Sequence, residues 1–276
     1  MEWQKVFKNV INSLINIIIL VWILFPLYWL VNMSLKSFGE LRTWPPTFFP
    51  MQPTFVNYID ALITLNALPY LINTFIVAAG STALALGLSL PMAYIASRFE
   101  FRGKWDILFT ILTFRFLPPA AIVIPLYMFA RTLGLFDTHT LLIMIYSAIN
   151  IPIGTWVLMS YFDEIPKEIE EAYMLDGYSR LKTFLKITLP LSKTGIIAIF
   201  MILFALSYGE YLLAGMLTTS AAKTFPVFMG ERWESPRGIE YGLLSAAAII
   251  ALIPLIIIFV SVRKHLVRGL TFGAVR

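Results

Sequence analysis

The sequence predicts an all-α integral membrane protein with six transmembrane helices, and three observations support this fold class. Of the 276 residues, 59% are hydrophobic and only 13% are charged, whereas soluble domains carry about 25% charged residues. The mean hydropathy is +0.79. A soluble fold of this length cannot bury so much apolar surface, but a bilayer removes the need to bury it. Finally, the apolar residues gather into six nearly uncharged segments, each close to the roughly 20 residues that cross hydrocarbon.

The six segments follow one another along the chain. They cover 9–35, 70–97, 106–131, 137–163, 195–219 and 240–263. The first lies between Lys8 and Lys36, is too long for the core of a signal peptide and lacks a small-residue cleavage site. We therefore interpret it as a true span. The second occupies the uncharged run that ends before Arg98.

Two of the segments contain residues that should interrupt a helix. Pro118, Pro119 and Pro125 interrupt the third segment, and Asn150-Ile151-Pro152-Ile153-Gly154 interrupts the fourth. At membrane depth, such breaks are tolerated where the backbone lines a cavity or packs on protein. The pattern therefore indicates either ordinary kinks or cavity-lining backbone.

Arg115 and Glu210 are the only charges within the spans. At about 1.5 Å per residue, Arg115 lies roughly 13 Å from the start of its segment at Asp106, close to mid-membrane. A charge there must face a pore or a partner, so Arg115 either locks two helices together or lines a translocation path. Asn73 and Asn150 add polar groups that could bind substrate hydroxyls or neighbouring helices. Glu210 lies nearer the outer surface, where a solvated or subunit-interface role is expected.

The 21 basic residues are divided unequally between the two sides of the spans. Fourteen lie on one side, six lie on the other, and Arg115 lies within a span. Because loops rich in Lys and Arg stay in the cytosol, the side with fourteen is cytosolic and both termini are inside. The net charge of +5 therefore reflects membrane sidedness, and no nucleic-acid partner is expected.

The domain organisation follows from this topology. Residues 1–8 form a cytosolic N-terminus, and 36–69 form an external loop rich in proline and aromatic residues. A transmembrane core of 70–262 includes the longest cytosolic loop, 161–194, and 263–276 form a cytosolic tail. With no cysteine and only two histidines, neither a disulfide nor a metal site is expected.

The loop 161–194 has a pattern of its own. Pro166 suits the first turn of a helix, whose apolar positions recur at helical spacing until Gly177 stops it. Ser179 can cap a second helix, which Pro190 should end. Two short helices with a glycine corner are too small to be stable alone. The residues leave open whether their apolar faces float at the membrane interface, pack on the spans, or bind a partner protein.

This loop carries a resemblance to a known family. The run Glu171-Ala172-Tyr173-Met174-Leu175-Asp176-Gly177, followed by Ile187 and Leu189-Pro190, resembles the EAA loop of binding-protein-dependent ABC importer permeases. The C-terminal Arg268-Gly269-Leu270-Thr271-Phe272-Gly273-Ala274-Val275 is similar to the tail of the smaller membrane subunit of maltose/trehalose-type transporters. Two residues depart from the pattern, because Tyr173 and Tyr178 stand where the family has alanine.

The resemblance implies a type I ABC importer permease fold in the inner (plasma) membrane of a bacterium or archaeon. It implies four partners, namely a second and larger permease subunit, an ATPase homodimer, an extracellular sugar-binding protein and membrane lipid. Together these would import a di- or oligosaccharide such as maltose or trehalose, with this chain forming half of the path. The chain has no Gly-x-x-x-x-Gly-Lys phosphate loop. It would therefore hold no cofactor and be no enzyme itself, with ATP and Mg²⁺ on the ATPase.

The resemblance also implies roles for particular residues. In such importers the loop docks on the ATPase and converts its closure into reorientation of the membrane helices. The coupling residues implied are Glu171, Ala172, Asp176 and Gly177. The tail residues implied to contact the ATPase are Arg268, Gly269, Thr271 and Gly273.

The main alternative is a self-sufficient secondary transporter or channel. Such a protein would show internal repeats and charged residues that form an ion pathway, whereas this sequence has no clear repeat and two intramembrane charges. A membrane-embedded enzyme is a second alternative, but no His-Glu-x-x-His or Gly-x-Ser-x-Gly motif occurs. Dependence of transport on ATP and added ATPase subunits would distinguish the first alternative.

Overall fold

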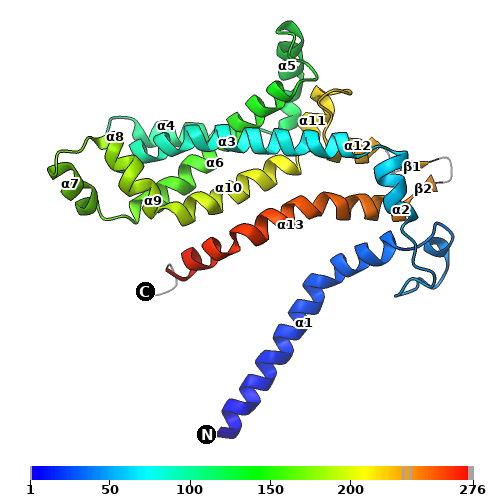
Figure 1. Ribbon diagram of the computed structural model, residues 1–276. Helices are drawn as coiled ribbons and strands as arrows, with labels where there is room; N and C mark the ends of the chain where they lie inside the picture. The colour runs from blue at the N-terminus through cyan, green and yellow to red at the C-terminus, as the bar shows by residue number, and fades with distance from the viewer. Residues whose placement is uncertain (1, 232–233, 236–237, 273–276) are drawn as a thin grey trace. The chain divides into compact units, whose positions relative to one another are not determined.

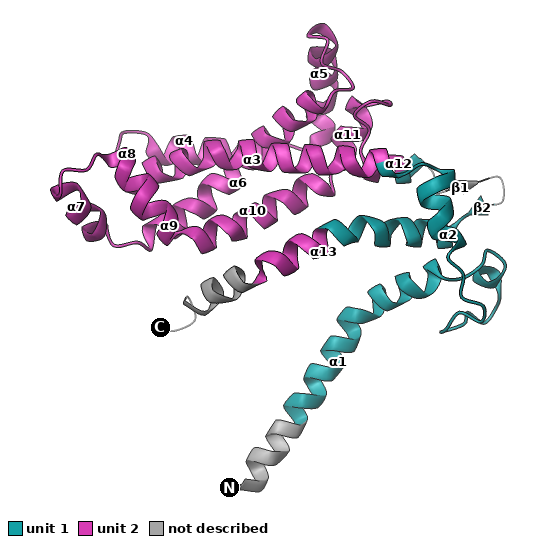
Figure 2. Cartoon of the chain, in the orientation of Figure 1, with its two compact units in different colours: residues 1–68, 229–254 teal, residues 69–228, 255–276 magenta. Residues whose placement is uncertain are grey.

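The computed structural model describes residues 2–231, 234–235 and 238–272, with side chains described for 11–231 and 238–263. The chain divides into two compact units (Figure 2), of which the first contains 1–68 and 229–254 and the second contains 69–228 and 255–276. Helices dominate both units (Figure 1). The strands in the described range form a single antiparallel pair, β1 (Glu234–Ser235) and β2 (Gly238–Ile239).

The first unit is built around α1 and the N-terminal part of α13. Its helical elements are α1 (Glu2–Ser34), a 3₁₀ turn (Glu40–Arg42), α2 (Val56–Ile59), a π-helical turn (Asp60–Thr64) and α13 (Tyr241–Phe272), which continues into the second unit. Asn57 Nδ2 donates to the backbone carbonyls of Ser34 and Lys36 at 2.9 and 2.8 Å, and so fixes α2 to the end of α1. The apolar stretch of α1 is not buried within the chain, as expected of a helix surrounded by lipid.

The second unit contains most of the helices. They are α3 (Leu68–Arg98), α4 (Lys104–Arg115), α5 (Pro119–Thr132), α6 (His139–Asp163), α7 (Lys167–Leu175), α8 (Arg180–Thr183), α9 (Leu189–Leu191), α10 (Lys193–Tyr208), α11 (Leu212–Leu217) and α12 (Phe225–Glu231). Helices α3, α6 and α10 pack together in its core (Figure 1), where Ala85, Leu158 and Leu203 are fully buried. Gly154 permits close approach of α6 to α3, because a Cβ there would lie 2.6 Å from Ser89 Oγ.

Among the described residues, four helices are long and apolar enough to cross a membrane, or six if each bent helix pair counts as one span. The four are Ile11–Ser34, Leu68–Arg98, His139–Asp163 and Tyr241–Arg263. The bent pairs are Lys104–Arg115 with Pro119–Thr132, at 88°, and Arg180–Leu191 with Lys193–Tyr208, at 76°. The predicted break after Arg115 is therefore a sharp bend. The all-α fold class predicted from composition is confirmed.

The predicted break in the fourth segment is wrong. Helix α6 continues without interruption through 150–154, with Pro152 buried in its interior. Asn150 is also buried, and Gly154 is the contact point with α3. The polar and small residues of this stretch therefore serve helix packing.

The predicted continuous helix over 195–219 is also wrong. Helix α10 ends at Tyr208 and α11 begins at Leu212. Glu210 accepts hydrogen bonds from the backbone N–H groups of Leu213 and Ala214, at 2.8 and 3.0 Å. A side chain that caps free N–H groups starts a new helix, which explains why the apolar run is divided.

Candidate functional site

The loop 161–194 folds as two helical pieces around a glycine corner. Helix α7 begins after Pro166, which occupies its N-cap position. Gly177 has φ +88°, the left-handed conformation that commonly ends a helix. Ser179 accepts a hydrogen bond from the backbone N–H of Lys182 and caps α8. The predicted helix–corner–helix geometry is therefore confirmed.

The second helical piece runs through a π-helical turn, Phe184–Thr188, into α9. It ends at Leu191, one residue after the predicted end at Pro190. In that turn the N–H of Leu189 bonds to the carbonyl of Phe184, five residues earlier. Pro190 lies in the first positions of α9, where its missing N–H is tolerated. The chain then bends by 76° between Arg180–Leu191 and Lys193–Tyr208.

The four predicted coupling residues lie on the exposed side of this loop. They are Glu171, Ala172, Asp176 and Gly177. Leu175, between them, is 88% exposed, and a Cβ added to Gly177 would meet nothing within 4 Å. The motif is therefore accessible to another molecule.

The two residues that depart from the family pattern contact each other. The rings of Tyr173 and Tyr178 stack with centroids 4.2 Å apart and an interplanar angle of 10°. The stack joins α7 to the residue that follows Gly177. The two larger side chains thus brace the corner from within the loop.

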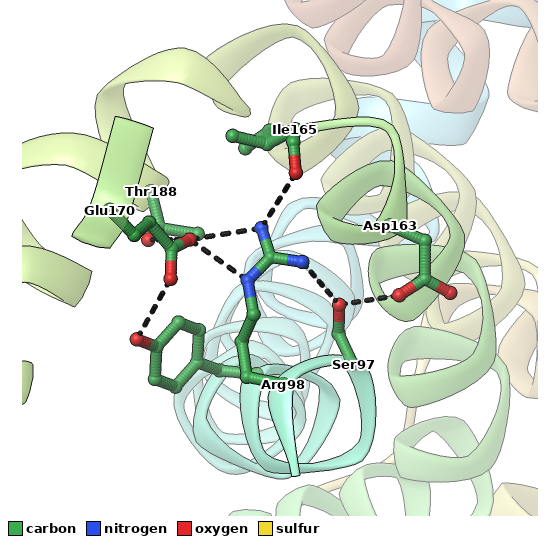
Figure 3. Close-up of polar contacts among 7 residues, drawn as sticks. Ser97, Arg98, Asp163, Ile165, Glu170 and Thr188 are labelled. Carbon is green, nitrogen blue, oxygen red and sulfur yellow. Dashed lines mark hydrogen bonds and ion pairs between the residues drawn. The ribbon is translucent and has the colours of Figure 1, made fainter. Parts of the chain in front are cut away.

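Glu170 and Glu171 are neighbours that face opposite environments. Adjacent helical residues lie about 100° apart around the axis, and Glu170 is only 3% exposed while Glu171 is exposed. Arg98, the last residue of α3, donates from Nε and Nη2 to Glu170 Oε1 at 3.0 and 2.9 Å (Figure 3). Tyr94 and Thr188 donate their hydroxyls to the same carboxylate, at 3.2 and 2.8 Å.

The same arginine also contacts the connection between α6 and α7, directly and through Ser97. Its Nη2 donates to the carbonyl of Ile165 at 3.1 Å, and its Nη1 donates to Ser97 Oγ at 3.0 Å (Figure 3). Ser97 Oγ in turn donates to Asp163 Oδ1 at 2.5 Å. We call Tyr94, Ser97, Arg98, Asp163, Ile165, Glu170 and Thr188 the anchor cluster. It joins α3, α6, α7 and the π-helical turn in one hydrogen-bonded network.

Sequence reasoning missed the anchor cluster. It placed an apolar face on α7, yet Ile169, on that face, is 44% exposed, while the buried residue of the helix is Glu170. The one available signal was Arg98, a basic residue at the very end of a span. Such a residue either reaches the interface or finds a carboxylate partner, and the sequence does not say which carboxylate.

Arg115 and Asn150 meet at a cavity of about 70 Å³ within the second unit. Arg115 Nε is buried and has no hydrogen-bond partner. Asn150 Nδ2 donates to Ser207 Oγ at 2.8 Å, and Ser81 Oγ donates to the same hydroxyl at 3.0 Å. The predicted lock for Arg115 would need a carboxylate or carbonyl at its guanidinium, and no ion pair to it occurs among the described residues.

Glu210 also lines this cavity. Its carboxylate accepts the Tyr146 hydroxyl at 2.5 Å in addition to the two backbone N–H groups that begin α11. This carboxylate is therefore engaged within the fold.

Asn73 lies apart from the cavity and holds the segment after α11. Its Nδ2 donates to the carbonyls of Ala221 and Lys223 at 3.0 Å each, and its Oδ1 lies 2.8 Å from His139 Nε2. The structure thus separates Asn73 from Arg115 and Asn150.

Asp137 clamps the neighbouring stretch of backbone. Its carboxylate accepts the backbone N–H groups of Thr219, Ser220, Ala221 and Ala222 at 2.9–3.1 Å. Partial burial disfavours the charged form, but these four donors outweigh it and hold the pKa of Asp137 well below its usual range.

The predicted tail site lies outside the part of the chain whose side chains are described. This applies to Arg268, Gly269 and Thr271, and Gly273 lies beyond the described residues altogether. For 264–272, the structure describes the backbone as a continuation of α13.

The fold and the exposed loop together define a class of protein, the permeases with the type I ABC importer fold. A solved bacterial ABC transporter involved in import of the acidic polysaccharide alginate contains a chain with the same fold. The TM-score is 0.75 at 23% identity, covering 94% of this chain and 96% of that chain.

The chain belongs to the family described as binding-protein-dependent transport system inner membrane component, whose model matches residues 85–272. It is similar to the trehalose/maltose transport system permease protein MalG of Thermococcus litoralis, at 34% identity over 99% of each chain. It is also similar to the sulfoquinovosyl glycerol transport system permease protein SmoH of Agrobacterium fabrum, at 32% identity over 92% of this chain and 89% of that protein.

Proposed function

We propose that this chain is one permease subunit of an ATP-driven importer of di- or oligosaccharides such as maltose or trehalose. The loop 166–190 would dock on an ATPase homodimer, which binds ATP and Mg²⁺, and the chain would form half of the path beside a second, larger permease. Sugar-loaded extracellular binding protein would deliver the substrate. The observation that carries the proposal is the exposed Glu171–Gly177 motif on a loop that is anchored to the membrane helices.

The sugar class is supported by the relatives. Those named for sugars include the permeases for trehalose/maltose, sulfoquinovosyl glycerol and galactooligosaccharides. All are glycosides with several hydroxyl groups. A path for such substrates needs hydrogen-bond donors and acceptors that replace water.

Arg115 and Asn150 are the residues we assign to the path, and Asn73 is assigned to packing. Arg115 Nε is buried and unpaired beside the cavity, and a guanidinium offers a planar fork of donors suited to sugar hydroxyls. Arg115→Lys should leave assembly intact and reduce uptake, because lysine cannot reproduce that fork. A stable Arg115→Met complex with unaltered uptake of every substrate would contradict the assignment.

The decisive experiment is reconstitution. The complex of both permeases and the ATPase, placed in proteoliposomes with the binding protein, should accumulate radiolabelled maltose or trehalose only with ATP inside the compartment that holds the ATPase. Uptake that follows an ion gradient and needs no ATPase would instead establish a secondary transporter. Both termini should lie on the ATPase side.

A further inference from the structure

Within the described part of the chain, Arg98–Glu170 is the ion pair in which both side chains are buried, at 5% and 4% exposure. The other ion pair, Lys104–Glu100, leaves its carboxylate 82% exposed. Around the buried pair lie the apolar residues of the second unit's core, including Phe162 and Phe184. The pair is thus enclosed between the end of α3 and the loop that follows α6.

Helix α7 has few other connections to the membrane helices. It packs on α8 and on the π-helical turn Phe184–Thr188, which belong to the same loop. Its apolar residues Ile169 and Leu175 are exposed, and Tyr173 stacks on Tyr178 within the loop. Among the described residues of α7, Glu170 is the one whose side chain forms hydrogen bonds with α3.

Separation of these two charges is strongly disfavoured. A buried carboxylate without its cation, or a buried guanidinium without its anion, loses both hydration and partner. Arg98 donates two hydrogen bonds to one carboxylate oxygen and a third to the carbonyl of Ile165. Thr188 attaches the far side of the loop to that same oxygen. Consequently, α7 cannot slide along α3 without separating Arg98 from Glu170 and leaving a buried charge without its partner.

We propose that Arg98 and Glu170 are positioning residues that make α7 and α3 move as one rigid body, so that displacement of α7 by the ATPase reorients α3. This inference rests on the proposed function. Glu171 contacts the ATPase on the outer side of α7, and Glu170 transmits the movement on the inner side. The role of Glu170 is mechanical and requires no contact with the sugar or with ATP.

The test compares Glu170→Gln with Glu168→Gln, an exposed glutamate on the same helix, in the reconstituted complex. The readout is the number of ATP molecules hydrolysed per molecule of maltose or trehalose imported. Glu170→Gln should raise that ratio by about fivefold or more while the ATPase still co-purifies, and Glu168→Gln should leave it unchanged. An assembled Glu170→Gln complex with the wild-type ratio would overturn the inference.

Two further variants keep the test valid if Glu170→Gln fails to assemble. Tyr94→Phe removes one hydrogen bond to Glu170 but no charge, and should raise the ratio by a smaller factor. The double variant Arg98→Cys/Glu170→Cys, on a chain without native cysteine, can be joined by a bifunctional thiol reagent. Cross-linking should restore the wild-type ratio, and assembled complexes that stay uncoupled after cross-linking would overturn the rigid-body role. A wild-type complex without ATP-dependent uptake would overturn the proposed function instead.

Discussion

Replacement of Gly177 with valine should disrupt the corner of the loop through the backbone alone. Gly177 has φ +88°, and a Cβ there would meet nothing within 4 Å. The Cβ itself therefore meets no clash, and the cost considered is that of holding an L-residue in the left-handed region, about 1–2 kcal/mol. A β-branched residue is especially unfavourable there. Such a cost corresponds to a factor of roughly 5–30 in the population of the native corner.

The assay is equilibrium binding of the ATPase to the permease complex in nanodiscs. We expect Gly177→Val to weaken binding by about 5–30-fold, with the thermal transition of the membrane helices unchanged because the corner lies at an exposed position. Gly177→Asn is the matched control, because asparagine tolerates the left-handed conformation, and it should retain most of the affinity.

Two results would refute this reasoning. Wild-type affinity of a Gly177→Val complex would show that binding of the ATPase does not depend on the conformation of the corner at Gly177. Equal damage from asparagine and valine would show that the partner needs the bare surface of glycine, so that close approach, and not φ, is the constraint.

Three further predictions concern topology and stability. A cysteine at Gln52 should react with an impermeant thiol reagent in intact cells and a cysteine at Glu168 should not; the reverse pattern would invert the topology. Asp137→Asn should lower the free energy of unfolding by about 1 kcal/mol. Because the folded pKa of Asp137 is depressed, its contribution is complete above the unfolded pKa of about 3.9 and is lost as pH falls through the folded pKa. Equal acid sensitivity of wild type and variant in thermal melts would contradict this. Gly195→Ala should cost about 1–3 kcal/mol by overpacking, since its Cβ would lie 2.4 Å from the Tyr161 ring. Adding Tyr161→Ala should recover most of that loss, and an unrelieved loss in calorimetry would argue against the clash.

Helices with a continuous apolar run were predicted closely from the sequence. The second segment, 70–97, is observed as Leu68–Arg98, and the fourth, 137–163, as His139–Asp163. The fifth was mispredicted because its division depends on Glu210, whose carboxylate is oriented by Tyr146 from another helix. Hydropathy identifies the segments that can cross a membrane. It does not reveal a helix cap whose geometry depends on a side chain from another helix.

The loop shows the same limit on a smaller scale. The glycine corner and the serine cap depend on local backbone chemistry, and both were predictable from residue type. The anchor cluster depends on Arg98 and Glu170, which are 72 residues apart. No local pattern distinguishes the buried Glu170 from its exposed neighbour Glu171. Only the packing of α7 on the membrane helices separates them.

The two intramembrane charges illustrate why sequence position alone does not assign a role. Arg115 and Glu210 line the same cavity, and two opposite charges in predicted spans would ordinarily be interpreted as an ion pair. Glu210, however, is already satisfied by two backbone N–H groups and the Tyr146 hydroxyl, so it has little need of a cation. Arg115 retains a buried Nε without a partner. A buried donor without a partner is costly, and the role in the path proposed above would give this nitrogen a hydroxyl of the sugar as its partner.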